Sequence, residues 1–113
     1  MHEMFAQGDL LIERVADVAP IGTVTNPEAK LTVLAEGELS GHRHAIYDRV
    51  TLFRDDDLAR DIPPELYVGH VRVDVPVARV VHDEHAAVDL PRGTYRLRRQ
   101  RELEPRDVQR VAD

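Results

Sequence analysis

Alternating apolar and polar positions recur along this chain and predict a structure made mostly of β-strands. In the clearest run, residues 67–77, apolar or small residues occupy every second position and share one face with Tyr67, while His70, Arg72 and Asp74 share the other. Pro76 predicts the end of this strand or a bulge in it. Shorter runs of strand-forming residues lie at 10–15, 21–25, 31–36, 49–53, 86–90 and 94–103.

Turn-forming residues separate these runs and indicate the fold class. Gly8-Asp9, Asn26-Pro27 and Pro91-Arg92-Gly93 are turn signals, and glycines at 37 and 41 bracket a further turn. Many short strands joined by turns are typical of a small barrel or a sandwich. The best helix candidate is the acidic run 55–60, with a solvated loop as its alternative. We therefore expect one all-β domain spanning residues 1–113, with at most one short helix.

Composition narrows the chemistry that such a domain performs. The chain has 113 residues, of which 42% are hydrophobic and 32% charged, and this balance favours a globular fold over disorder. It contains no cysteine, so any transition-metal site must use histidines and carboxylates. No apolar run is long enough to span a bilayer and the first residues lack signal-peptide features, so we expect a cytoplasmic protein with no membrane partner.

Four of the six histidines fall in two pairs and form the best candidate site. His42 and His44 are two residues apart, so in a strand both imidazoles point to the same face. His82 and His85 are three residues apart, which places them on one side of a turn and requires a bend there. If the two pairs meet, they predict a site for one divalent metal ion, because neutral imidazole is a common metal ligand.

The residue types leave the identity and the role of this metal open. Zinc, iron, nickel, copper and manganese all suit a histidine-rich set without cysteine. Asp48 and Glu84 are candidates for an additional oxygen ligand or for a general base beside a metal-bound water. Four protein ligands favour a structural role, whereas three leave a position for metal-dependent chemistry on a small molecule. Alternatively, the four histidines are incidental surface or turn residues, as we expect for His70 on the outer face of its strand.

Two stretches resemble known proteins. Gly37-x4-His42-x-His44-x3-Asp48 resembles the first metal motif of the cupins, which has a glycine, a His-x-His pair and a carboxylate a few residues later. This resemblance covers twelve residues and implies a small β-barrel with a metal inside; many cupins are dioxygenases, isomerases or sensor modules. The segment from His82-x-x-His85 to Gln100-Arg101-Glu102 resembles small uncharacterised bacterial proteins, which implies no activity.

An uneven distribution of charge gives the alternative function. Residues 1–91 carry 8 Lys and Arg against 17 Asp and Glu, a balance of −9, whereas residues 92–113 carry 7 Arg against 4 acids, a balance of +3. One interpretation is an edge strand whose arginines pair with nearby acids. The other is a non-enzymatic interaction module in which Arg96 and Arg98 contact an anionic or protein partner. The net charge of −6 argues against nucleic acid, while the sequence leaves an oligomer open.

Overall fold

The computed structural model describes residues 3–20, 22–24, 31–36 and 42–100, and these residues confirm the all-β class. Two single-turn 3-10 helices, η1 (Asp56–Leu58) and η2 (Pro64–Leu66), are the only helices in this part of the chain. The strands form one antiparallel sheet and are β1 (Met4–Gln7), β2 (Leu10–Val15), β3 (Thr23–Val24), β4 (Thr32–Glu36), β5 (Arg43–Ile46), β6 (Val50–Arg54), β7 (Tyr67–Val81) and β8 (Val88–Arg99).

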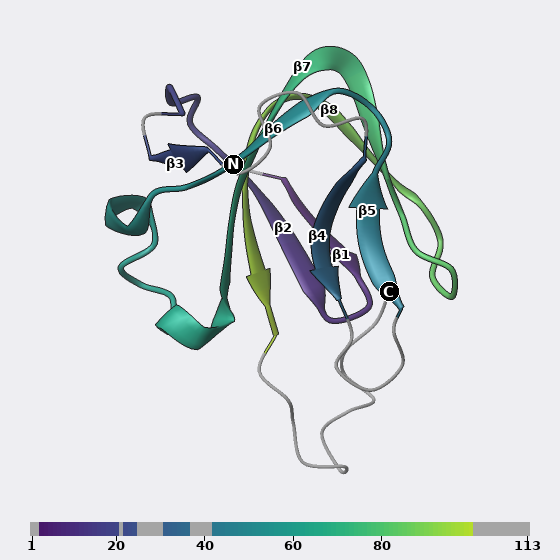
Figure 1. Cartoon of the computed structure of the whole chain (residues 1–113), viewed down its shortest axis with the longest axis horizontal. Helices are drawn as coiled ribbons and strands as arrows, with labels where there is room; N and C mark the ends of the chain where they lie inside the picture. The colour runs from purple at the N-terminus through teal and green to yellow at the C-terminus, as the bar shows by residue number, and fades with distance from the viewer. Residues whose placement is uncertain (1–2, 21, 25–30, 37–41, 101–113) are drawn as a thin grey trace, which may run out of the picture.

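The long strand β7 organises the sheet. The strand order is β1-β2-β8-β7-β5-β4, with β6 also paired to β7 and β3 paired to β6. The first half of β7 pairs with β6 and its second half with β5, so the strand changes partner along its length. The change follows an irregularity in register between Val73 and Val77, which is the bulge that Pro76 predicted. Figure 1 shows β7 arching over the molecule at this bend.

The bulge also changes which side chains of β7 face the core. Before it, Val71 and Val73 are buried, as the alternation predicted. After it, Val77 is 49% exposed while Ala78 and Val80 are buried, because one irregular step reverses the inward face of a strand. The core is one cluster of buried apolar residues contributed by most strands: Leu10, Ile12, Leu34, Ala35, Ile46, Val50, Val71, Val73, Ala78, Val80, Leu90, Tyr95 and Leu97.

Two expectations about β8 are wrong. Pro91-Arg92-Gly93 is not a turn, because β8 continues from Val88 to Arg99 and stays paired with β7 through Gly93 and Pro91. Nor is β8 an edge strand, since it lies between β2 and β7. The Gly8-Asp9 turn is confirmed: Gly8 has φ +58, the left-handed region that glycine reaches without steric cost, and it joins β2 to β1, a strand that the pattern did not predict.

The expectation that His70 is exposed is also wrong, because the segment 55–66 covers this end of the sheet. Ala59, Ile62 and Tyr67 form a small second cluster there. His70 is 1% exposed and stacks on Phe53 with 5.4 Å between the ring centroids. The Tyr67 hydroxyl forms a hydrogen bond of 2.6 Å with His70 Nδ1, so this buried histidine is a satisfied core residue.

Three sequence expectations lie outside the described residues: the turns at Asn26-Pro27 and at 37–41, and the last positions of the 94–103 strand. The acidic run that was the helix candidate contains η1, a single 3-10 turn capped by Asp55, so the short-helix expectation holds in reduced form. In the part of the chain that is described, no helix is both long and apolar enough to cross a membrane.

Candidate functional site

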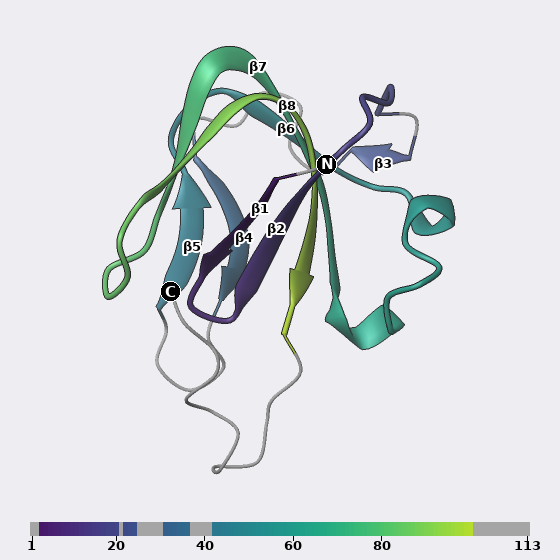
Figure 2. The ribbon, with the colours of Figure 1, turned by 180° about the vertical axis from the view of Figure 1, so that it is seen from behind.

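The two histidine pairs meet because of how β5 pairs with β7. Ala45 lies opposite Val81 in this antiparallel ladder, so the next position outward places His44 beside His82. The chain then bends through residues 83–85 before it returns as β8, which supplies the bend that the His82-x-x-His85 spacing required. Figures 1 and 2 show this hairpin end, the start of β5 and the β1–β2 turn at the same end of the molecule.

Within the four-histidine cluster of His42, His44, His82 and His85, His82 is central. Its ring centroid lies 4.6 Å from that of His44, 4.6 Å from that of His85 and 5.8 Å from that of His42. The four rings therefore lie together, as the spacing within the two pairs predicted.

A buried glutamine that the sequence reasoning missed fixes the orientation of His44. Gln7, at the end of β1, is 0% exposed, and its Nε2 donates to Val80 O at 3.0 Å and to Ala86 O at 2.9 Å. Both amide hydrogens are thereby used, so Oε1 faces His44 Nδ1 at 2.8 Å as an acceptor. His44 must donate from Nδ1, which leaves the lone pair of the neutral ring on Nε2.

The second nitrogen of His44 faces a carboxylate. Its Nε2 lies 3.2 Å from Asp9 Oδ1, in the β1–β2 turn. His44 is 3% exposed, and burial lowers its pKa below the ordinary value, although the hydrogen bond with Asp9 opposes this. In the neutral ring, two groups that can only accept hydrogen bonds thus face each other. This arrangement attracts a cation.

Glycine at position 8 keeps this place compact. A β-carbon built on Gly8 would lie 2.8 Å from His85 Nε2 and 3.4 Å from His44 Cε1. The β1–β2 turn therefore packs directly against both imidazoles. Any other residue at position 8 would have to move His85 or the turn.

The remaining two histidines are held differently. His42 Nδ1 bonds to Asp83 Oδ2, and its Nε2 lies 3.5 Å from Glu84 Oε2. His82 Nδ1 accepts a hydrogen bond from the Glu84 backbone at 3.0 Å, so the neutral His82 ring carries its hydrogen on Nε2. As the side chains stand, no group of three or more His, Asp or Glu residues in the described ranges is arranged to hold a metal ion.

Other predicted site residues lie elsewhere. Asp48, beyond the opposite end of β5, accepts a hydrogen bond from the Arg79 backbone at 2.8 Å. Arg96 forms ion pairs with Glu13 at 2.7 Å and with Asp61 at 2.8 Å, and its side chain is 16% exposed. Arg98, on the same face of β8, has a buried Nε with no hydrogen-bond partner among the described residues. The ion-pair partners of Arg96 lie on β2 and in the segment 55–66, and neither belongs to the four-histidine cluster.

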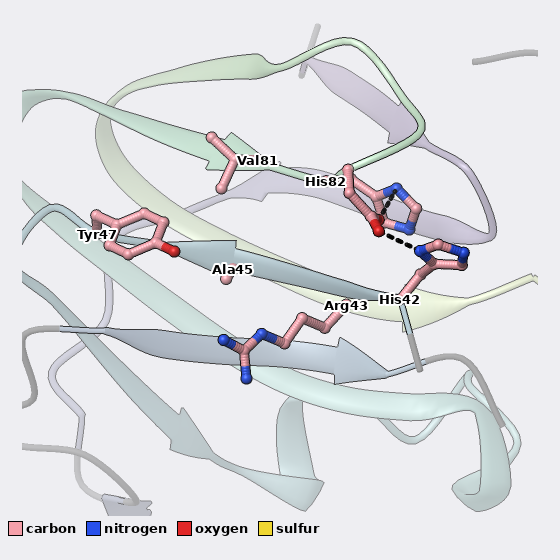
Figure 3. Close-up of a pocket in the computed structure, with 7 residues that line it drawn as sticks. His42, Arg43, Ala45, Tyr47, Val81 and His82 are labelled. Carbon is pink, nitrogen blue, oxygen red and sulfur yellow. Dashed lines mark hydrogen bonds and ion pairs between the residues drawn. The ribbon is translucent and has the colours of Figure 1, made fainter. Parts of the chain in front are cut away.

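An open groove of about 340 Å³ adjoins the cluster. It is lined by His42, Arg43, Ala45, Tyr47, Val81, His82 and Asp83. Figure 3 shows His42 and His82 at one end of this groove and Tyr47 at the other. Its volume is at the lower end of the range typical of small-molecule sites.

Comparison with protein families gives one result. Residues 6–100 match the model of a domain of unknown function, DUF8820. The chain belongs to this family. The matched range holds all four histidines of the cluster together with Gln7 and Asp9. No curated protein and no solved structure matches the chain.

Proposed function

We propose that this DUF8820 protein binds one divalent transition metal ion at the four-histidine cluster. The observation that carries the proposal is the pair formed by His44 Nε2 and Asp9 Oδ1, which lie 3.2 Å apart with a lone pair on each. Two ligands of a tetrahedral metal with bonds of about 2.0–2.1 Å are separated by about 3.3 Å. The pair therefore has the spacing of two neighbouring ligands of one ion.

His85 and His82 are the nearest further ligands. His85 Nε2 lies against the same turn as Asp9, and the His82 ring packs against those of both His44 and His85. His82 has to turn its ring and give up the hydrogen bond from the Glu84 backbone before it offers a lone pair toward His44. His42, held by Asp83 at the groove, is the fourth histidine of the predicted set and the outermost.

Gln7 acts as a positioning residue in this proposal. A ligating histidine usually donates its other ring N–H to a fixed acceptor, which sets the tautomer and the ring orientation. Gln7 Oε1 does this for His44, and two backbone carbonyls fix Gln7 in turn. The carboxylate that the cupin resemblance implies, Asp48, bonds to the Arg79 backbone instead, so Asp9 takes that role here.

The groove beside His82 favours a metal with one open position over a closed structural site. Three protein ligands and a water would leave that position for metal-dependent chemistry on a small molecule. A cytoplasmic location belongs to the same proposal. The alternative, an interaction module that uses Arg96 and Arg98, has less support, because Glu13 and Asp61 already hold the Arg96 guanidinium.

The test is metal binding by protein purified without a histidine tag and stripped with a chelator. Zn²⁺ titrated by calorimetry should bind at one ion per chain, and Co²⁺ should give the absorption bands of a low-coordinate site. His44→Ala and Asp9→Asn should each weaken binding at least tenfold. His70→Gln, which removes a buried histidine outside the cluster, should leave the affinity unchanged. Equal zinc affinity in wild type and His44→Ala would refute the proposal.

A further inference from the structure

The groove beside the cluster has its own chemistry, which does not depend on a metal. Arg43, Ala45 and Tyr47 occupy alternate positions along and just after β5, so they share the face opposite to His44. Ala45 is 3% exposed, and with Val81 opposite it in the β5–β7 ladder it gives the groove a small apolar floor. A flat ligand can lie close to such a floor because no long side chain rises from it.

One wall of the groove is aromatic. Tyr47 is 65% exposed, the most exposed of the large hydrophobic residues in the described part of the chain. An exposed ring beside a small apolar floor offers a stacking surface to a planar group, since aromatic pairs gain energy beyond the area they bury.

The groove also contains a cation. Among the side chains that the structure describes, none forms a hydrogen bond or ion pair with the Arg43 guanidinium, whereas Arg79 on the adjacent strand pairs with Asp89 at 2.7 Å. A guanidinium binds a carboxylate through two parallel hydrogen bonds, so Arg43 is suited to one anionic group. Figure 3 shows Arg43 extending beside Ala45, between Tyr47 and His42.

The far end of the groove limits the charge of the ligand. Asp83, which bonds to His42 there, is 58% exposed, and the whole chain has a net charge of −6. A second carboxylate on the ligand would face this acid and be repelled. The volume of about 340 Å³ suits a small molecule and not a polymer.

We propose that this groove binds a small aromatic monocarboxylate, with the carboxylate on Arg43, the ring against Tyr47 and the far edge toward His42 and His82. The groove adjoins the four-histidine cluster at His42 and His82. The groove and the metal site use different residues for the main contacts. Failure of one is therefore separable from failure of the other.

The experiment uses chelator-stripped protein and benzoate as the probe, followed by calorimetry and by the NMR signals of the Tyr47 ring. Benzoate should bind more tightly than each of three comparison ligands. Acetate lacks the ring, benzyl alcohol lacks the charge, and phthalate carries two carboxylates. Arg43→Gln should weaken benzoate binding at least tenfold and Tyr47→Ala at least threefold. Both side chains are exposed, so both variants should fold as the wild type does by circular dichroism.

Arg60→Gln is the matched control, because it removes the same charge from a side chain that is 80% exposed on the segment 55–66. It should leave benzoate affinity unchanged. The proposal is overturned if benzoate fails to bind at about 10 mM, which corresponds to under 3 kcal/mol of binding free energy. It is also overturned if Arg43→Gln binds benzoate as the wild type does, or if acetate binds as tightly as benzoate.

Discussion

Replacing Gln7 by leucine tests the hydrogen-bond network that orients His44. The substitution keeps a side chain of similar size in a position that is 0% exposed, but it removes three hydrogen bonds at once. Val80 O loses a donor, His44 Nδ1 loses its acceptor, and Ala86 O, which is only part-buried, becomes free to bond to water. The buried His44 Nδ1 is thus left without its acceptor, and the buried Val80 O has one donor fewer.

The expected loss of stability follows from these two groups. A buried donor without a partner, His44 Nδ1, costs about 1–3 kcal/mol, and the hydrogen bond lost at Val80 O costs about 0.5–1.5 kcal/mol. The leucine side chain regains about 1–2 kcal/mol through its apolar surface. We expect the free energy of unfolding of metal-free Gln7→Leu to fall by about 1–2 kcal/mol, which is a measurable share of the 5–15 kcal/mol typical of a small domain.

Urea denaturation at neutral pH measures this loss, with Gln100→Leu as the matched control. Gln100 is partly exposed at the end of β8 and contributes its backbone N–H to Asp9 O, which a side-chain change leaves intact. The control should stay within about 0.5 kcal/mol of wild type. Gln7→Leu should also bind Zn²⁺ at least tenfold more weakly, because the His44 tautomer is no longer fixed. If Gln7→Leu is as stable as Gln100→Leu, the hydrogen bonds of Gln7 do not hold His44 in place.

Three further predictions concern other parts of the molecule. Burial, and then the charge of Arg96, lower the pKa of His70 below its ordinary 6.5, so below about pH 6.5 the unfolded chain binds a proton at His70 more readily than the folded chain does. The free energy of unfolding should therefore fall as the pH drops from 7 to 5, and His70→Gln should make this fall less steep in urea denaturation. An unchanged slope would contradict a lowered pKa for His70. Arg96→Ala should cost about 1–3 kcal/mol of unfolding free energy because its side chain is 16% exposed between two acids, while Arg60→Ala, with an exposed pair, should show no measurable loss; equal effects would refute the distinction. Gly8→Ala should both lower the melting temperature and weaken Zn²⁺ binding, because the alanine β-carbon would collide with His85 and because a φ of +58 is unfavourable for alanine. A variant that melts and binds Zn²⁺ as the wild type does would show that the β1–β2 turn accommodates a β-carbon at this position.

The strands that show regular alternation could be predicted from the sequence, but features that depend on pairing could not. The runs at 10–15 and 49–53 match β2 and β6 closely, because the alternation of apolar and polar residues that defines each strand lies within the run itself. The turn predicted at Pro91-Arg92-Gly93 failed because β7 is paired along this stretch and holds β8 extended through it. Tertiary pairing here outweighs local turn preference.

The sequence predicted only part of the candidate site, because the other part depends on strand pairing. The spacing of His42 with His44 and of His82 with His85 was enough to suggest a shared site, because each pair is local in sequence. Gln7 and Asp9 were missed since they reach His44 from 37 and 35 residues away, through a hairpin whose first strand was not predicted. The one signal in the sequence is that Gln7, a polar residue, lies between the apolar pair Phe5-Ala6 and the Gly8-Asp9 turn. This position does not indicate which residue Gln7 contacts.

Two buried histidines of this chain show why one is structural and the other is a candidate ligand. His70 and His44 are 1% and 3% exposed, and burial lowers the pKa of both, which favours the neutral form of each ring. His70 Nδ1 forms a hydrogen bond with the Tyr67 hydroxyl and its ring stacks on Phe53, so neutral core residues hold this ring. His44 donates to Gln7 from Nδ1, so the lone pair on its Nε2 is turned toward the carboxylate of Asp9. A lone pair that faces a half-exposed carboxylate is unfavourable unless a positive charge joins the two groups, and in a chain without cysteine the proposed metal ion, bound by imidazole and carboxylate, would meet that need.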